Sequence, residues 1–301
     1  MLLSFPGGLD QSCPGVQWAD WLELCLLFTP SETLSRDDMR EALELYIPEE
    51  EQLDFVVEEA FAEIRRRQTL LRELYPVQHQ STHLAKLHSS ANSTSFSFLL
   101  AVSVQGFYEQ TSPRGAAWHE PARLFEYVVT AALRRYLNGK AIRIGTPREA
   151  PVPSDFAECL RYMGRETAEL ARGPLNPSVG EGDEKCDVVA WAPFRDGKAG
   201  QVVVLAQCGI GDGWKGKLEH LSDTVWQQQF DWHAPPVRAF AFPYLLDEDP
   251  AEWRYISTRG GIPFDRIRIS SLVRDSDFDG PIVTRIQQWC EDFARKLPYA
   301  D

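Results

Sequence analysis

Five polar side chains between residues 183 and 217 belong to the types that bind metal ions and stabilise a transferred phosphoryl group. They are two acids, one amide and two lysines: Asp183, Asp187, Gln207, Lys215 and Lys217. Carboxylate and carbonyl oxygens are the usual ligands of hard divalent cations. A lysine ammonium offsets negative charge that develops during a reaction. A buried hairpin needs neither acids at one end nor lysines at the other, so this spacing indicates a functional site.

Two Val-rich segments carry most of this group, Cys186–Trp191 and Gln201–Cys208. Each is short and apolar, and a polar turn separates them, which predicts two neighbouring strands joined as a hairpin. The earlier segment Pro121–Leu137 has the apolar spacing of a helix and ends at an Asn-Gly pair. Glu126 falls close to the apolar face of that helix, where it either marks the edge of the face or points inward to the site.

The surrounding chain predicts further helices and strands. From residue 121 the order is helix, strand, helix, strand, strand, helix and strand, over residues 121–137, 141–145, 154–172, 186–191, 201–208, 214–230 and 237–246. Later segments predict a strand over 267–271 and a helix over 281–296. Towards the N-terminus we expect helices over 16–28, 39–46 and 48–74, and a loop over 76–95.

This order, with an acid at the start of one central strand and an amide at the end of the next, resembles the PD-(D/E)xK nuclease superfamily. The core of that family is α-β-β-β-α-β, and the resemblance covers about residues 115–250. Asp187 matches the family's Asp, and Gln207 matches the acid of the (D/E)xK triplet, as in the QxK variant of Mrr-like nucleases. Glu126 matches an acid often found on the first helix. The resemblance implies an α/β, restriction-endonuclease-like core, a mixed central sheet flanked by helices.

The triplet's lysine is missing, because Gly209 stands at its position. Members of the family can supply this lysine from the following helix. We therefore expect Lys215 or Lys217 to replace it, and Lys215 is favoured because Trp214 would anchor the start of that helix. The resemblance implies Mg²⁺- or Mn²⁺-dependent hydrolysis of DNA, in bacterial restriction or anti-phage defence. The metal ligands it implies are Asp187, Gln207, Glu126 and Asp183.

Charge is distributed unevenly along the chain. The net charge is −13, and residues 1–114 hold 17 acidic and 8 basic residues. A surface of this sign repels DNA. We therefore expect an acidic helical domain over 1–112 that recruits or is inhibited by a partner protein, and a nuclease-like domain over 113–301. Coordinated cleavage of both DNA strands would require two active sites, and hence a homo-oligomer.

Cysteine usage and hydropathy indicate a cytoplasmic protein. The six cysteines include no CxxC pair and several lie in apolar runs, as reduced core cysteines do. No segment approaches the roughly 18 consecutive apolar residues of a membrane span. We also expect no secretory signal, because the first residues lack a basic stretch followed by a long apolar one.

Three other interpretations stay open. The glutamine and the missing lysine also fit a catalytically inactive nuclease fold that serves as a binding module. The segment Gly211–Lys217 matches the GxxxxGK spacing of a P-loop, although Leu218 stands where a Ser or Thr would hold magnesium. Cys208 with His220 or His233 would provide the nucleophile and base of a cysteine hydrolase.

Overall fold

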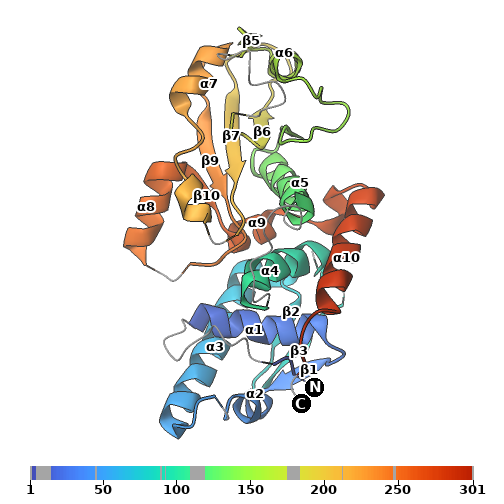
Figure 1. Ribbon diagram of the computed structural model, residues 1–301, viewed down its shortest axis with the longest axis vertical. Coiled ribbons are helices and arrows are strands. Elements are labelled where there is room, and N and C mark those ends of the chain that lie inside the picture. Colours follow the sequence, from blue (N-terminus) through green and yellow to red (C-terminus); the bar gives the residue numbers. More distant parts are fainter. Residues whose placement is uncertain are drawn as a thin grey trace. The chain divides into compact units, whose positions relative to one another are not determined.

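The computed structural model describes residues 2–4, 15–44, 46–88, 90–91, 93–108, 119–174, 184–211, 213–246 and 249–299 (Figure 1). The chain divides into two compact units. Unit 1 comprises Met1–Pro121, Pro243–Glu248 and Arg266–Asp301, and unit 2 comprises Ala122–Phe242 and Asp249–Asp265. The C-terminal segment thus belongs with the N-terminal residues, whereas the sequence led us to expect it in a domain spanning 113–301.

Unit 1 combines helices with a small antiparallel sheet. Its helices are α1 (Gly15–Phe28), α2 (Arg36–Leu43), α3 (Glu50–Leu71), α4 (Ser93–Tyr108), α9 (Arg266–Leu272) and α10 (Gly280–Ala294), with 3₁₀ turns η1 (Arg72–Leu74) and η5 (Asp275–Asp277). The strands β1 (Thr33–Ser35), β2 (Val77–His79) and β3 (His83–Lys86) pair in the order β1-β3-β2. The expected loop over 76–95 therefore contains a hairpin, and the strand expected over 267–271 is helix α9.

A buried network of charged side chains explains why the C-terminal segment joins unit 1. The guanidinium of Arg266, at the start of α9, is fully buried, pairs with Asp20 of α1 and donates to Ser103 Oγ of α4 at 2.9 Å. Arg67 of α3 pairs with the same Asp20 at 2.7 Å and with Glu23 at 2.8 Å. Buried charges are tolerated only when they are paired, so these contacts fix α9 against α1, α3 and α4.

Unit 2 is built on a five-stranded mixed sheet. In sequence order its strands are β4 (Lys140–Arg143), β6 (Val188–Ala192), β7 (Val202–Cys208), β9 (Val237–Ala241) and β10 (Ile262–Phe264), and their order across the sheet is β10-β9-β7-β6-β4. The β4/β6 and β6/β7 pairs are antiparallel, whereas β7/β9 and β9/β10 are parallel. The hairpin expected from the two Val-rich segments is confirmed.

Helices flank this sheet (Figure 1). They are α5 (His119–Tyr136), α6 (Phe156–Thr167), α7 (Asp223–Gln229) and α8 (Pro250–Gly260), with the 3₁₀ turn η4 (Trp214–Lys217) and the short pair β5 (Leu170–Ala171) and β8 (Phe230–Asp231). The fold class is therefore mixed α/β, a mixed sheet flanked by helices. The single helix expected over 214–230 is two helices, because Ser222 caps a new start at α7 by accepting from the Val225 N–H.

The two faces of the sheet pack against different helices. Side chains of Val189 on β6 and Leu205 on β7 join a core cluster with α6 and with Trp226 of α7. On the opposite face Arg143 of β4 contacts α5, where it pairs with Glu126 and lies over the Tyr127 ring. Because side chains alternate along a strand, neighbouring residues within β6 and within β7 point to opposite faces of the sheet. Among the helices that the structure describes, none has the length and apolar character needed to cross a lipid bilayer.

Candidate metal and nuclease site at the ends of β6 and β7

Asp187 lies immediately before β6 and ties three strands together. Its N–H donates to Ala206 O at 2.9 Å, and its carbonyl oxygen accepts from Ile144 N at 2.8 Å and Gly145 N at 3.0 Å. Its carboxylate oxygen Oδ2 accepts from Cys208 N at 2.7 Å. The position of this carboxylate is therefore fixed from the backbone of both neighbouring strands.

Gln207 is the penultimate residue of β7, next to Cys208. Val188 is paired with Ala206, and the Asp187 N–H also donates to Ala206 O, so Asp187 and Val188 both lie against Ala206 as in a β-bulge, and the regular register of the two strands ends before Asp187 and Gln207. The Gln207 side chain is buried, and its Oε1 has no hydrogen-bond partner among the described residues. A buried acceptor without a partner costs about 1–3 kcal/mol, which a bound cation or water would recover.

Glu126 belongs to a different contact. Its carboxylate pairs with the guanidinium of Arg143 at 2.7 Å, and Arg143 also donates to Pro147 O at 2.9 Å. Gly145 is needed here, because a Cβ at this position would lie 2.3 Å from Glu126 Oε2. The sequence left Arg143 ambiguous between a DNA contact and a structural ion pair, because nothing in it distinguishes Arg143 from other arginines near a turn. Its position two residues before Gly145, on the strand after the Glu126 helix, is the signal that could have identified the pair.

Cys208 connects these groups electrostatically. Burial, together with the negative charges of Asp187 and Glu126, raises the pKa of the Cys208 thiol well above its usual value, and Arg143 opposes this shift. These acids are thus close enough to act on the same sulfur. The neutral thiol is a poor nucleophile, which argues against a cysteine hydrolase at this position. His233 in turn is held by the buried Glu169, with its Nδ1 2.9 Å from Glu169 Oε2.

The two candidate lysines differ in their surroundings. The ammonium of Lys215 is exposed and pairs with Glu252 of α8, next to the ring of Trp214. Lys217 is half-buried, and no ion pair of Lys217 occurs among the described residues. In a 3₁₀ turn, residues two apart point in different directions. Lys215, which the sequence favoured, is therefore the one engaged elsewhere.

Trp214 anchors this turn, as the sequence led us to expect. Its ring stacks on Phe242 at 4.4 Å and on Phe240 at 6.0 Å between centroids. Gly209 allows that approach, since a Cβ there would lie 2.6 Å from the Phe240 ring. Gly209, where the resemblance led us to expect a lysine, is thus part of a packing contact.

The P-loop interpretation finds little support in the backbone. The residues after β7 form the turn η4, and the next α-helix begins only at Asp223. A P-loop requires the lysine at the start of a helix whose N–H groups bind phosphate. Lys217 instead ends a four-residue 3₁₀ turn.

The oxygen atoms of Asp187 and Gln207 suit a hard cation. Asp183, the fourth expected ligand, lies outside the described residues. Within the described ranges, no group of three or more His, Cys, Asp or Glu side chains is arranged to hold a metal ion. Asp187 and Gln207 are therefore the two candidate ligands at the neighbouring ends of β6 and β7, and the remaining positions would be left to water or substrate.

Comparison with known proteins adds nothing to these observations, since no family model, no curated protein and no solved structure matches the chain.

Proposed function

We propose that unit 2 has a restriction-endonuclease-like core and acts as a metal-dependent nuclease on DNA. The order α5, β4, β6, β7, α7 and β9 supports this proposal, because it reproduces helix, three antiparallel strands, helix and strand, with α6 inserted after the first strand. β9 also joins the sheet next to β7 and parallel to it.

The observation that carries the proposal is the fixed carboxylate of Asp187 before β6. Its Oδ2 accepts from Cys208 N at the end of the adjacent strand β7, and the acceptor of the preceding residue, Gln207, is buried without a partner in the described parts of the chain. A divalent cation bound there would activate a water molecule and neutralise charge on the phosphate. Asp187 would bind the cation and hold it near the backbone of Cys208. Gln207 would bind the same cation through Oε1.

Of the two lysines, we assign the positive charge beside the phosphate to Lys217, because Lys215 pairs with Glu252. Replacing Lys217 by Ala should reduce cleavage at least about tenfold. The matched Lys215→Ala variant should retain activity within a factor of about two. The opposite order of effects would return the role to Lys215.

Cleavage of supercoiled plasmid in the presence of Mg²⁺ tests the proposal. Asp187→Asn keeps an oxygen that can accept from the Cys208 N–H but removes the charge, so the fold should survive while cleavage falls at least about 100-fold. Asp155→Asn is the matched control, because Asp155 caps α6 by accepting from Glu158 N and Asn caps equally well. Equal cleavage by wild type and Asp187→Asn, or none by the wild type, would overturn the nuclease proposal.

A second function has specific support, an inactive nuclease fold that binds nucleic acid or protein. Two of the groups expected in the site are neutralised, Glu126 by Arg143 and Lys215 by Glu252. Under this alternative the wild type cleaves nothing, and the fluorescence anisotropy of a labelled DNA duplex reports binding that Asp187→Asn leaves unchanged. Binding that requires Mg²⁺ and is lost in Asp187→Asn would contradict it.

A further inference from the structure

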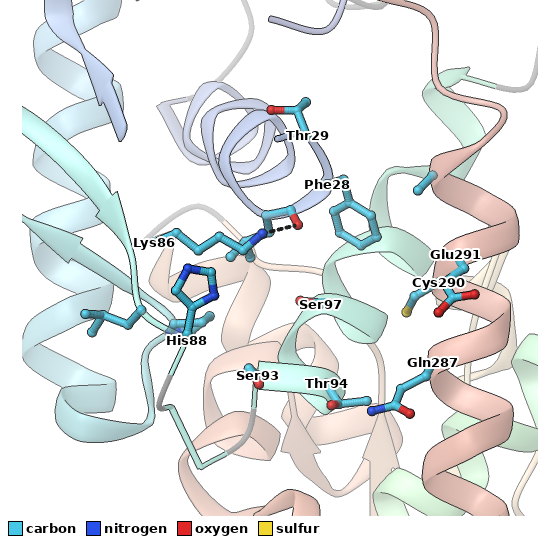
Figure 2. A pocket seen from close by; sticks show the side chains of 14 residues that line it. Phe28, Thr29, Lys86, His88, Ser93, Thr94, Ser97, Gln287, Cys290 and Glu291 are labelled. Carbon is cyan, nitrogen blue, oxygen red and sulfur yellow. Dashed lines mark hydrogen bonds between the residues drawn. The ribbon is translucent and has the colours of Figure 1, made fainter. Parts of the chain in front are cut away.

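Unit 1 contains a pocket of about 570 Å³, well apart in sequence from the groups discussed above (Figure 2). Its walls come from the C-terminal end of α1, from β3 and the residues after it, from the first turns of α4, and from α10. Volumes of this order accommodate small-molecule ligands. All the lining residues belong to unit 1.

The pocket wall carries a cationic side chain, Lys86, that has no acidic partner in the described chain. Glu291 lines the pocket from the opposite side (Figure 2), and the Arg295 guanidinium lies 3.6 Å from Glu291 and 2.6 Å from Asp292. The Lys86 ammonium donates to Leu27 O at 3.2 Å, and in the described part of the chain no carboxylate forms an ion pair with it. The Leu27 carbonyl thus positions the ammonium at the wall without neutralising it, and an anionic group would do so.

Hydroxyl groups of α4 lie between these two sides. Ser93 and Ser97 both line the pocket, and the described residues offer neither hydroxyl a hydrogen bond (Figure 2). Helical Ser and Thr residues usually donate to a carbonyl one turn earlier, as Ser103 does to Leu100 O at 2.7 Å in the same helix. The two hydroxyls therefore remain available to donate to an anionic oxygen.

The acid that binds the start of this helix is already satisfied. The carboxylate of Asp275 accepts from the backbone N–H groups of Thr94 and Ser95 at 2.9 and 3.0 Å, and from Ser95 Oγ at 2.9 Å. Its charge is offset by the start of α4. It therefore does not compete for Lys86.

The pocket has an apolar wall and no activated nucleophile. The ring of Phe28 lines it and is held by an edge contact with Phe293, at 5.6 Å between centroids. Burial, with the charges of Asp275 and Glu291, raises the pKa of the Cys290 thiol, so the sulfur stays neutral. The site is suited to binding, not to covalent chemistry.

We propose that this pocket binds a small organic anion, whose carboxylate or phosphate contacts Lys86, Ser93 and Ser97 and whose planar or apolar body lies against Phe28. The proposal is independent of the nuclease assignment in unit 2. Its ligand should therefore bind equally well to Asp187→Asn.

Isothermal titration calorimetry on the full-length protein tests the proposal with three probes, AMP, phenylacetate and inorganic phosphate. We expect one site with a Kd below about 1 mM for AMP or phenylacetate and at least tenfold weaker binding of inorganic phosphate, which lacks the body. Tighter binding of AMP identifies a phosphate ester as the ligand class, and tighter binding of phenylacetate identifies a carboxylate. No binding of either, or equal binding of all three, would overturn the proposal.

Two variants locate the bound probe. Lys86→Met should weaken binding at least tenfold, whereas Lys296→Met, an exposed lysine just after α10, should leave it within a factor of two. Ser97→Leu places a bulky side chain in the pocket and should abolish binding, and it decides the question if Lys86→Met does not fold. Unchanged affinity in Ser97→Leu would contradict the assigned position.

Discussion

Replacing Gln207 by Glu introduces the acid that the proposed nuclease function would place here, and tests directly whether this position binds a cation. The Gln207 side chain is 5 % exposed and its Oε1 has no partner among the described residues. The new carboxyl group would be buried, and it would belong to the residue before Cys208, whose N–H binds the negatively charged Asp187 carboxylate. Burial and a neighbouring like charge both raise the pKa of a carboxyl group. Without metal, the variant should therefore be less stable than the wild type.

The size of this loss follows from the protonation cost. An unfolded Glu ionises with a pKa of about 4.3, so keeping the buried group neutral at pH 7.5 costs at most about 4 kcal/mol, or about 1.4 kcal/mol per pH unit. Because the folded-state pKa is the higher one, the penalty is absent below about pH 4 and grows as the pH rises towards that folded-state pKa. Thermal unfolding measured between pH 5 and 8 would follow this slope.

Magnesium should reverse the loss if Gln207 is a ligand position. A cation at 100 times its Kd stabilises the protein by about 2.7 kcal/mol, which corresponds to about 5–10 °C in Tm for a unit of this size. The matched control is Gln229→Glu in α7, because Gln229 is also fully buried with both side-chain polar atoms unpartnered in the described chain. That variant should lose similar stability and gain nothing from Mg²⁺. Equal rescue of both variants, or of neither, would refute the reasoning.

Two further substitutions test the packing around the site and in unit 1. Gly145→Ala should lower the free energy of unfolding measured in urea by about 1–3 kcal/mol, because its Cβ would displace the Glu126 carboxylate from Arg143. A loss below about 0.5 kcal/mol would show that Glu126 can move aside without a cost in stability, and would contradict this prediction. Arg67→Met should lower the free energy of unfolding by about 3–5 kcal/mol, because it leaves buried carboxylates unpaired. The control is Arg65→Met, at an exposed position, which should change the free energy of unfolding by no more than about 0.5 kcal/mol. Similar unfolding midpoints for these two arginine variants would contradict the role given to the buried network.

Local sequence patterns predicted the elements that carry the candidate site. The β6–β7 hairpin follows from two Val-rich runs separated by a polar turn. The helix expected over 39–46 is α2, which begins three residues earlier, at Arg36, because Ser35 and Asp38 form a capping box there. Each of these features depends on residues close together in the chain. Interactions of this kind can be read from spacing alone.

Features set by distant residues could not be predicted in the same way. The segment after Asp265 alternates apolar and polar residues like a strand, yet it is helix α9 because Arg266 binds Asp20 on α1. Likewise, the sequence could not indicate that Lys215 pairs with Glu252, since α8 itself was not foreseen. Both contacts depend on tertiary structure, which overrides local propensity.

Electron paramagnetic resonance of Mn²⁺ titrated into the full-length protein tests the central claim, that Asp187 and Gln207 form a cation site, most directly. We predict one bound Mn²⁺ per chain in the wild type, binding at least about tenfold weaker in Asp187→Asn, and unchanged binding in Asp155→Asn. Wild type and Asp187→Asn with the same number of bound ions and the same affinity would contradict the claim.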